Sequence, residues 1–455
     1  MRLRSMILLS IGLFFICTIT TVRAQTFAYI PSSGDGNVTR VNTDDETFTS
    51  VSFEGDLTAT ESGDLYGAAI TPQGDYIVVT RNNTDDAVIL RTSSFTSPAA
   101  QVVLSVGDQP RGVAIESRGE YAYVANYGDD TVTEIYIPTH TRTDTIDIGE
   151  TGVPDGPWGV AAIYDEVEGT RKVYVANYDS GSISVINGGS VTNYTGIGGG
   201  PAGVALTPDG AYLYVALLDD DAVVVVRTSD NTVVKPITVG DSPWGVAVGS
   251  DGAYIYVTNS GLQDSNRGDT VTVIDAATQS LYDTFDVGVQ PTGVACPKNG
   301  DFAYVINQTG NSISRIEIAN TAAPVTEIGA GEIDNALAMG AFIGGAPPSA
   351  PSGLTTTVVS YDQIDLSWTD NSSDELGFKI ERRLDTSERY VQIAKVGAGV
   401  TTYSNGGLSG STAYRYRVRA YNEAADSGYA VSGSSTTDKG SFSWCFIGTL
   451  WQARP

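Results

Sequence analysis

Short runs of alternating apolar and polar residues, separated by glycine-rich turns, fill most of the first three quarters of the chain. Residues 243–259, PWGVAVGSDGAYIYVTN, show the unit most clearly. Gly-Val-Ala predicts a first strand, Asp-Gly a turn, and residues 254–257 a second strand. Residues 270–274 and 281–287 predict a third and a fourth strand. A four-stranded antiparallel sheet is therefore the expected building block.

Close copies of this unit recur along the chain. The glycine near the start of each first strand returns at steps of 45, 47, 44, 42 and 48 residues. These anchor glycines are Gly67, Gly112, Gly159, Gly203, Gly245 and Gly293. A four-stranded unit repeated every forty-odd residues is typical of a β-propeller, in which each unit forms one blade. The small residues of the first strand suit the crowded centre of such a ring.

The two ends of the repeat region predict how the ring closes. Residues 26–31, TFAYIP, align with 301–306, DFAYVI, so the chain enters at a second strand. The missing first strand is expected at 335–338, which lies 43 residues after 292–295. One blade would then combine both ends and leave no open sheet edge. The pattern thus predicts an all-β fold, a seven-bladed propeller over residues 25–345.

The recurring phrase GVA…YVxN…VIDxxT resembles the YVTN family of seven-bladed propellers. That family occurs in surface-layer proteins and in related secreted proteins of bacteria and archaea. The resemblance covers about 320 residues of the chain. It implies the fold, and function must be read from the site because one fold hosts many functions.

A second domain is predicted after a linker rich in proline and glycine. Residues 354–383 and 413–430 resemble a bacterial fibronectin type III domain, and we expect its β-sandwich over 346–438. In this resemblance Trp368 takes the core tryptophan position and Tyr414 the tyrosine-corner position. Such modules usually serve as spacers or adhesive units in secreted proteins, and no site is assigned to this one.

Both termini have patterns of exported proteins. Residues 1–24 combine two early arginines, an apolar run and a Val-Arg-Ala cleavage site, which predicts a secretory signal peptide. No later apolar run is long enough to span a membrane. Within residues 439–455, Ser443–Gly448 resembles the start of a Cys-Phe-Ile box, so this tail is either a sorting signal or a disordered end. We expect a secreted, cell-surface or periplasmic protein.

The charge of the chain narrows the choice of partners. The chain has 26 Lys and Arg against 53 Asp and Glu, which gives a formal charge of −27. Cleavage of the predicted signal peptide would remove Arg2, Arg4 and Arg23 and make the formal charge −30. This excess disfavours nucleic acid and anionic membranes as partners and is typical of a soluble extracellular protein. One His and three Met argue against haem, copper and a Ser-His-Asp site. Cys296 and Cys445 imply no disulfide framework, and we expect a monomer without a cofactor.

The residue before each anchor glycine is predicted to lie around one end of the propeller axis. Connections between blades, and turns between second and third strands, emerge on this face. The ring is chemically varied: Tyr66, Arg111, Trp158, Ala202, Trp244, Thr292 and, before the last inner strand, Asn335. Its aromatic side chains either cover the inner strands or stack on sugar rings and anchor a protein partner.

The turns on this face are acidic, and two interpretations apply to them. They carry Asp129, Asp130, Asp219, Asp220 and Asp221. Aspartate is common in turns because its carboxylate accepts hydrogen bonds from nearby backbone. Clustered carboxylates also bind Ca²⁺, which takes six to eight oxygen ligands, although no segment matches an EF-hand loop.

The expected function is that of an exported, non-catalytic binding or scaffold protein. An extracellular glycan or protein would bind at the ring of varied residues, and the fibronectin-like module would act as spacer or adhesive unit. One alternative is a lactonase-like hydrolase or lyase that uses Arg111 and carboxylates at the same place. No carboxylate pair has a spacing that selects it. Another alternative is a structural surface-layer component.

Overall fold

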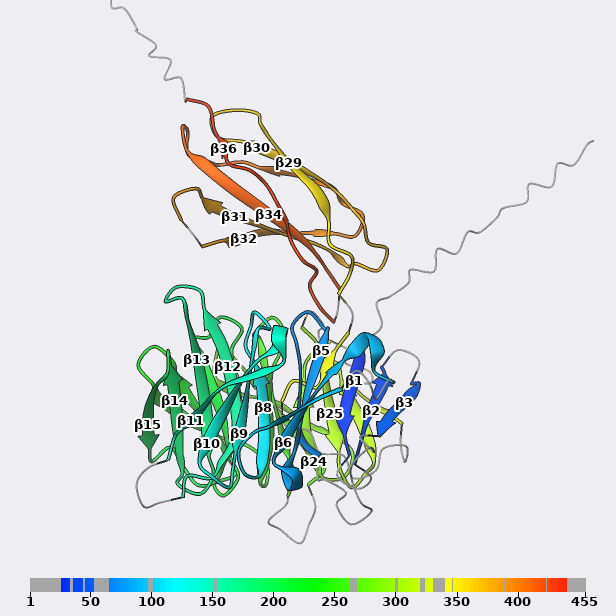
Figure 1. Cartoon of the computed structure of the whole chain (residues 1–455), viewed down its shortest axis with the longest axis vertical. Coiled ribbons are helices and arrows are strands. Elements are labelled where there is room, and N and C mark those ends of the chain that lie inside the picture. Colours follow the sequence, from blue (N-terminus) through cyan, green and yellow to red (C-terminus); the bar gives the residue numbers. More distant parts are fainter. Residues whose placement is uncertain are drawn as a thin grey trace, which may run out of the picture.

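The computed structural model describes residues 26–32, 36–43, 46–52, 65–96, 101–149, 154–261, 268–298, 302–319, 324–329, 340–345, 347–387, 389–422 and 424–439. These residues form a ring of sheets and, after it, a separate β-sandwich (Figure 1). Within these ranges no helix is long and apolar enough to cross a membrane. The predicted signal peptide 1–24 and the tail from residue 440 lie outside the described residues.

The ring consists of seven antiparallel sheets of four strands each, which confirms the seven-bladed propeller. Blade 1 contains β1 (Phe27–Pro31), β2 (Asn37–Asn42), β3 (Phe48–Ser52) and β28 (Ile343–Gly344). Blade 2 contains β4 (Leu65–Ile70), β5 (Tyr76–Arg81), β6 (Asp86–Arg91) and β7 (Gln101–Ser105). Blade 3 contains β8 (Pro110–Ile115), β9 (Tyr121–Asn126), β10 (Thr131–Tyr136) and β11 (Thr141–Asp147).

The other four blades follow the same order. Blade 4 contains β12 (Pro157–Asp165), β13 (Thr170–Asn177), β14 (Ser182–Asn187) and β15 (Ser190–Thr195). Blade 5 contains β16 (Pro201–Leu206), β17 (Tyr212–Leu217), β18 (Ala222–Arg227) and β19 (Thr232–Thr238). Blade 6 contains β20 (Pro243–Val248), β21 (Tyr254–Asn259), β22 (Thr270–Asp275) and β23 (Ser280–Asp286). Blade 7 contains β24 (Pro291–Ala295), β25 (Ala303–Asn307), β26 (Ser312–Ile316) and β27 (Val325–Ile328).

Blade 1 joins the two ends of the ring, as predicted, but through a different segment. β1 pairs with β2 on one side and with β28 on the other, and the Tyr29 N–H donates to the Phe342 carbonyl at 2.9 Å. The expected closing strand at 335–338 was therefore wrong, and those residues lie outside the described ones. In the observed pairing of β1 with β28, Gly340 takes the anchor position of blade 1. The sequence Asn-Ala-Leu-Ala at 335–338 therefore resembled the Gly-Val-Ala signature in composition only.

The core of the ring lies between neighbouring blades. Tyr214 and Val225 of blade 5, for example, pack in one buried cluster with Ile255, Val257 and Ile274 of blade 6. Complete burial of a valine or isoleucine side chain stabilises a fold by about 1.5–3 kcal/mol. Each blade thus buries both of its faces, and the ring has to close for the first and last blades to do the same.

The anchor glycines are required because inner strands of adjacent blades approach one another closely. A methyl group on Gly159 would overlap the carbonyl oxygen of Ala202, and one on Gly203 would overlap that of Trp244. Any larger residue would push neighbouring blades apart. The crowding that the small first-strand residues indicated is therefore present in the structure.

A buried side-chain contact ties the second strand of most blades to the third. The asparagine that ends the second strand donates through Nδ2 to two hydroxyl groups of the third strand, at 2.7–3.0 Å. We call this the clamp position, and its asparagines are Asn126, Asn177, Asn259 and Asn307. Each of these asparagines is almost fully buried, so its amide donors need such partners.

Two blades replace the clamp asparagine by other matched pairs. In blade 2 Arg81 faces Asp86, and its Nε and Nη2 donate to the two carboxylate oxygens at 2.6 Å each. In blade 5 the facing residues are Leu217 and Ala222, which contact each other without polar groups. Both partners change together, because a single polar group left buried here would lack its partner.

The described part of the second domain is a two-sheet sandwich. One sheet has β29 (Ser352–Val358), β30 (Ile364–Thr369) and β33 (Thr402–Asn405). The other has β31 (Gly377–Leu384), β32 (Val391–Gly397), β34 (Ala413–Tyr421), β35 (Ala430–Val431) and β36 (Ser435–Thr436). Trp368 lies in its core against Phe378, and the Tyr414 hydroxyl accepts a hydrogen bond from the Ser409 N–H at 3.1 Å. Both positions expected from the fibronectin resemblance are confirmed.

An ion pair joins the sandwich to one face of the propeller. Lys298, in the turn between β24 and β25, lies 3.2 Å from the Asp426 carboxylate, which also contacts Lys379 and Arg419. Burial raises the pKa of Asp426, but Lys298, Arg419 and Lys379 together lower it to about 2. First-to-second-strand turns occupy the side of the ring to which the sandwich is joined (Figure 1). The face that carries the ring of varied residues is therefore the opposite one.

Candidate functional site

The predicted ring of varied residues occupies equivalent places in the blades. Each is the second residue of its inner strand and the first of two residues that form a β-bulge against the second strand. A bulge turns a side chain away from the regular strand direction. We call this set the mouth, and its described members are Tyr66, Arg111, Trp158, Ala202, Trp244 and Thr292. Asn335 lies outside the described residues.

Arg111 is the centre of the polar part of the mouth. Its guanidinium carbon lies 3.7 Å from the ring centroid of Trp158, 4.0 Å from Tyr127 and 5.1 Å from Tyr66. Such cation–π contacts are stronger where water is excluded. Burial lowers the pKa of Arg111, and Tyr66, Tyr127 and Asp179 partly oppose that effect. The Nε atom of Arg111 is buried and has no hydrogen-bond partner among the residues that the structure describes.

The two tryptophans of the mouth, Trp158 and Trp244, pack against each other. Each is only 9% exposed, and their rings meet edge to face with centroids 5.2 Å apart. Ala202 occupies the mouth position between them, and its small side chain leaves room for this contact. The indoles therefore cover the inner strands. In the described ranges, however, neither Nε1 of Trp244 nor the buried Oγ1 of Thr292 has a hydrogen-bond partner.

Two tyrosines of the site were missed by sequence reasoning. Tyr127 and Tyr178 are half-buried and contact Trp158, with ring centroids 5.6 and 4.9 Å away. Each immediately follows a clamp asparagine, Asn126 or Asn177. An aromatic residue directly after YVAN in two successive blades was the signal that could have found them.

Most of the acidic turn residues serve the backbone of the next blade connection. Oδ1 of Asp130 accepts hydrogen bonds from the N–H groups of Asp155 and Gly156 at 3.0 and 2.9 Å. Oδ1 of Asp221 accepts one from the Ser242 N–H at 2.8 Å. Asp130 and Asp221 have positive φ, 55° and 50°, a conformation that Asp tolerates better than most residues. This arrangement fits the backbone-capping interpretation.

The remaining calcium candidates also contact the backbone. Oδ2 of Asp129 accepts a hydrogen bond from the Asp108 N–H at 3.1 Å, and Oδ2 of Asp220 accepts one from the Gly199 N–H at 2.7 Å. Asp219 donates its N–H to the Gly199 carbonyl at 3.3 Å. In the described ranges no three His, Cys, Asp or Glu side chains are grouped so that they could hold a metal ion. Calcium binding by these residues stays a prediction.

A carboxylate lies near Arg111 at the mouth. Asp179 lies close enough to Arg111 and Tyr127 to affect the pKa of both. The pKa of Asp108 is raised by burial and by repulsion from Asp85 and Asp129. The mouth thus combines the guanidinium of Arg111, the carboxylate of Asp179 and the partly exposed ring of Tyr127.

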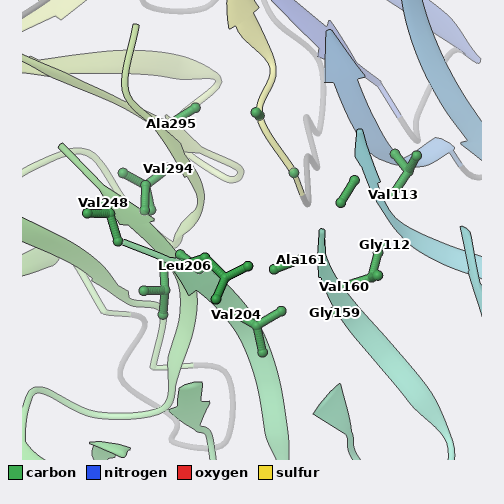
Figure 2. Close-up of a pocket in the computed structure, with 18 of the residues that line it drawn as sticks. Gly112, Val113, Gly159, Val160, Ala161, Val204, Leu206, Val248, Val294 and Ala295 are labelled. Carbon is green, nitrogen blue, oxygen red and sulfur yellow. The ribbon is translucent and has the colours of Figure 1, made fainter. Parts of the chain in front are cut away.

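An apolar cavity of about 250 Å³ runs along the axis inside the mouth. Figure 2 shows Gly112, Val113, Ala161, Val204 and Ala295 around it, all on inner strands. Among the described residues no carboxylate, histidine or lysine lines it. The thiol of Cys296 is the titratable side chain of this described lining, and burial raises its pKa. We therefore place polar recognition at the mouth.

Comparison with known proteins identifies the second domain. The family model of the fibronectin type III domain matches residues 349–434. Residues 349–434 are a fibronectin type III domain. An alpha-amylase of Niallia circulans is 34% identical over 95 residues, which is 20% of this chain and 7% of that enzyme. Exoglucanase B of Cellulomonas fimi is 35% identical over 80 residues, 17% of this chain and 7% of that enzyme.

The propeller resembles solved structures in its fold alone. A hydrazine synthase structure from Kuenenia stuttgartiensis has a TM-score of 0.52 at 20% identity, and the match covers 62% of this chain and 90% of that one. A functionally unknown protein from Desulfotomaculum acetoxidans has a TM-score of 0.55 at 16% identity, with coverage of 69% and 99%. At such identities the similarity establishes the architecture and leaves function open.

Proposed function

We propose that this chain is an exported, non-catalytic protein that binds a saccharide at the propeller mouth. The observation that carries the proposal is the combination of unpartnered donors with the carboxylate of Asp179 and with aromatic rings. Nε of Arg111, Nε1 of Trp244 and Oγ1 of Thr292 are buried and lack partners within the described part of the chain. Leaving such groups unsatisfied is costly, so a ligand that supplies acceptors would be favoured.

Saccharides match both the polar groups and the aromatic rings of the mouth. A sugar hydroxyl both donates and accepts, so it can satisfy Arg111 while donating to a carboxylate such as that of Asp179. The half-exposed rings of Tyr66 and Tyr127 offer flat apolar surfaces to the C–H face of a sugar. The acidic surroundings disfavour an anionic ligand and leave a neutral saccharide as the best fit.

The arrangement of the domains supports the same proposal. The fibronectin type III domain is joined to the opposite face of the ring through Lys298 and Asp426, so it leaves the mouth uncovered. Similar segments occur in an alpha-amylase and an exoglucanase, whose names denote action on glucans. The domain would act as a spacer, and the signal-like residues 1–24 together with the acidic charge favour an exported monomer that avoids nucleic acid.

A glycan array followed by calorimetry tests the proposal. Arg111→Ala should weaken binding of the saccharide found on the array at least about tenfold, because a desolvated charged hydrogen bond is lost. Arg118→Ala is the matched control, since Arg118 stacks on Tyr164 at 3.5 Å on the other face. Equal affinity of both variants would refute the mouth as the site. Binding of a protein but no glycan, or turnover of a polysaccharide or lactone, would contradict the proposed ligand or the absence of catalysis.

A further inference from the structure

A pair of tyrosines stands out on the outer part of blade 6. β23 contains a bulge at Tyr282, because Val273 faces Asp283 while Ile274 faces Leu281. The bulge brings the Tyr282 ring to 4.9 Å from that of Tyr254, which begins β21 two strands away. Tyr282 is 47% exposed. The two rings therefore form a ridge at the surface of the blade.

Equivalent tyrosines in blades 2 and 3 are covered by an arginine. Tyr76 begins β5 and has Arg91 over its ring at 5.2 Å, and Tyr121 begins β9 and has Arg171 over its ring at 3.8 Å. Among the described residues no lysine or arginine lies over the ring of Tyr254 or Tyr282. Blade 6 thus keeps the aromatic surface but lacks the arginine that covers it in blades 2 and 3.

The ridge borders a cleft of about 420 Å³ between blades 6 and 7. Tyr254, Tyr282, Tyr256 and Phe302 line it, together with the exposed carboxylate of Asp251. Oδ1 of Asp251 accepts a hydrogen bond from the Ala253 N–H at 2.8 Å, which fixes the carboxylate at the cleft wall. The volume lies within the usual range for a small-molecule site, and four of its nine described lining residues are aromatic.

We propose that this cleft is a second saccharide site, specific for a neutral sugar ring. The C–H face of the ring would stack on Tyr282 and Tyr254, and its hydroxyls would donate to Asp251. The carboxylate would repel acidic sugars. Asp251 lies in a first-to-second-strand turn, on the face to which the fibronectin type III domain is joined, so this site is separate from the mouth. The inference does not depend on what the mouth binds.

Affinity electrophoresis of the full chain, in gels that contain soluble starch or hydroxyethylcellulose, tests this site. The Arg111→Ala variant removes the mouth contribution and serves as the background. In that background Tyr282→Ala should raise the dissociation constant at least about tenfold, since loss of one stacked ring commonly has such an effect. The exposed Val234 occupies the equivalent bulge in blade 5, so Val234→Ala is the matched control and should change nothing.

The possible outcomes separate the two sites. If the gel still retards the Arg111→Ala protein but no longer retards the protein that also carries Tyr282→Ala, the result supports the cleft. This holds whatever Arg111→Ala alone does to retardation of the unchanged protein. Equal retardation of the Tyr282→Ala and Val234→Ala variants overturns it. Absence of retardation of the Arg111→Ala protein by both neutral polysaccharides also overturns it.

Discussion

The clamp and the mouth are two sets of equivalent positions in the same blades, and they differ in how their hydrogen-bond donors are satisfied. At the clamp, the donors of Asn126, Asn177, Asn259 and Asn307 all have acceptors in the neighbouring strand. At the mouth, Arg111, Trp244 and Thr292 keep buried donors without a partner among the described residues. The amide oxygens of Asn126, Asn177 and Asn307 at the clamp also lack partners there. The contrast therefore concerns donors, which the clamp matches to acceptors and the mouth leaves unmatched.

The exceptions at the clamp strengthen this contrast. Arg81 comes with Asp86, and Leu217 comes with Ala222, so a change in one strand is matched by a change in the next. At the mouth the residues vary without such matching, and buried donors are left without a partner among the described residues. Repeated positions that vary in matched pairs indicate structure, whereas unmatched donors at varying positions favour binding.

The largest effect is expected from breaking the clamp pair of blade 2. Arg81→Ala leaves the Asp86 carboxylate buried without its charged partner, and it should lower the free energy of unfolding by about 3–5 kcal/mol. Urea denaturation followed by circular dichroism measures the change. The double variant Arg81→Leu, Asp86→Ala copies blade 5 and should recover most of the lost stability. A single variant as stable as the double one would show that the pair is not matched.

A smaller effect is expected where the clamp is an asparagine. Asn177→Ala removes hydrogen bonds of 2.9 and 2.7 Å to Ser182 and Ser184 and should cost about 1–3 kcal/mol of unfolding free energy. The same denaturation experiment checks it, and saccharide binding at the mouth should stay unchanged. Weakened binding at full stability would mean that clamp and mouth are not separate in role.

The fold could be predicted from the sequence because its determinants are local and repeated. The spacing of the anchor glycines gave the number of blades, and Trp368 and Tyr414 marked the sandwich. Closure by both ends also followed from the alignment of residues 26–31 with 301–306. The strand that closes the ring could not be identified from the sequence. The short Ala-Leu-Ala segment and the Phe342–Gly344 segment both fit a small, apolar inner strand, and only the second pairs with β1 in the described structure.

The site could be predicted only in part. The equivalent positions of Arg111, Trp158 and Trp244 followed from the repeat, since the bulge is the same in each blade. The burial of both indoles could not be predicted from the repeat, because it depends on the small Ala202 at the mouth position between them. The contribution of Tyr127 and Tyr178 depends on side chains from different blades meeting in space, which spacing alone does not give.

The most direct test of the mouth observes the Trp244 indole N–H itself. The chain has five tryptophans, so two-dimensional ¹⁵N–¹H spectra contain few indole signals. The Trp244→Phe variant assigns the signal of Trp244, and Trp368→Phe that of the sandwich core. The account predicts that titration with the saccharide found on the array shifts the Trp244 signal to saturation and leaves the Trp368 signal in place. Saturable binding in calorimetry with an unmoved Trp244 signal would contradict it.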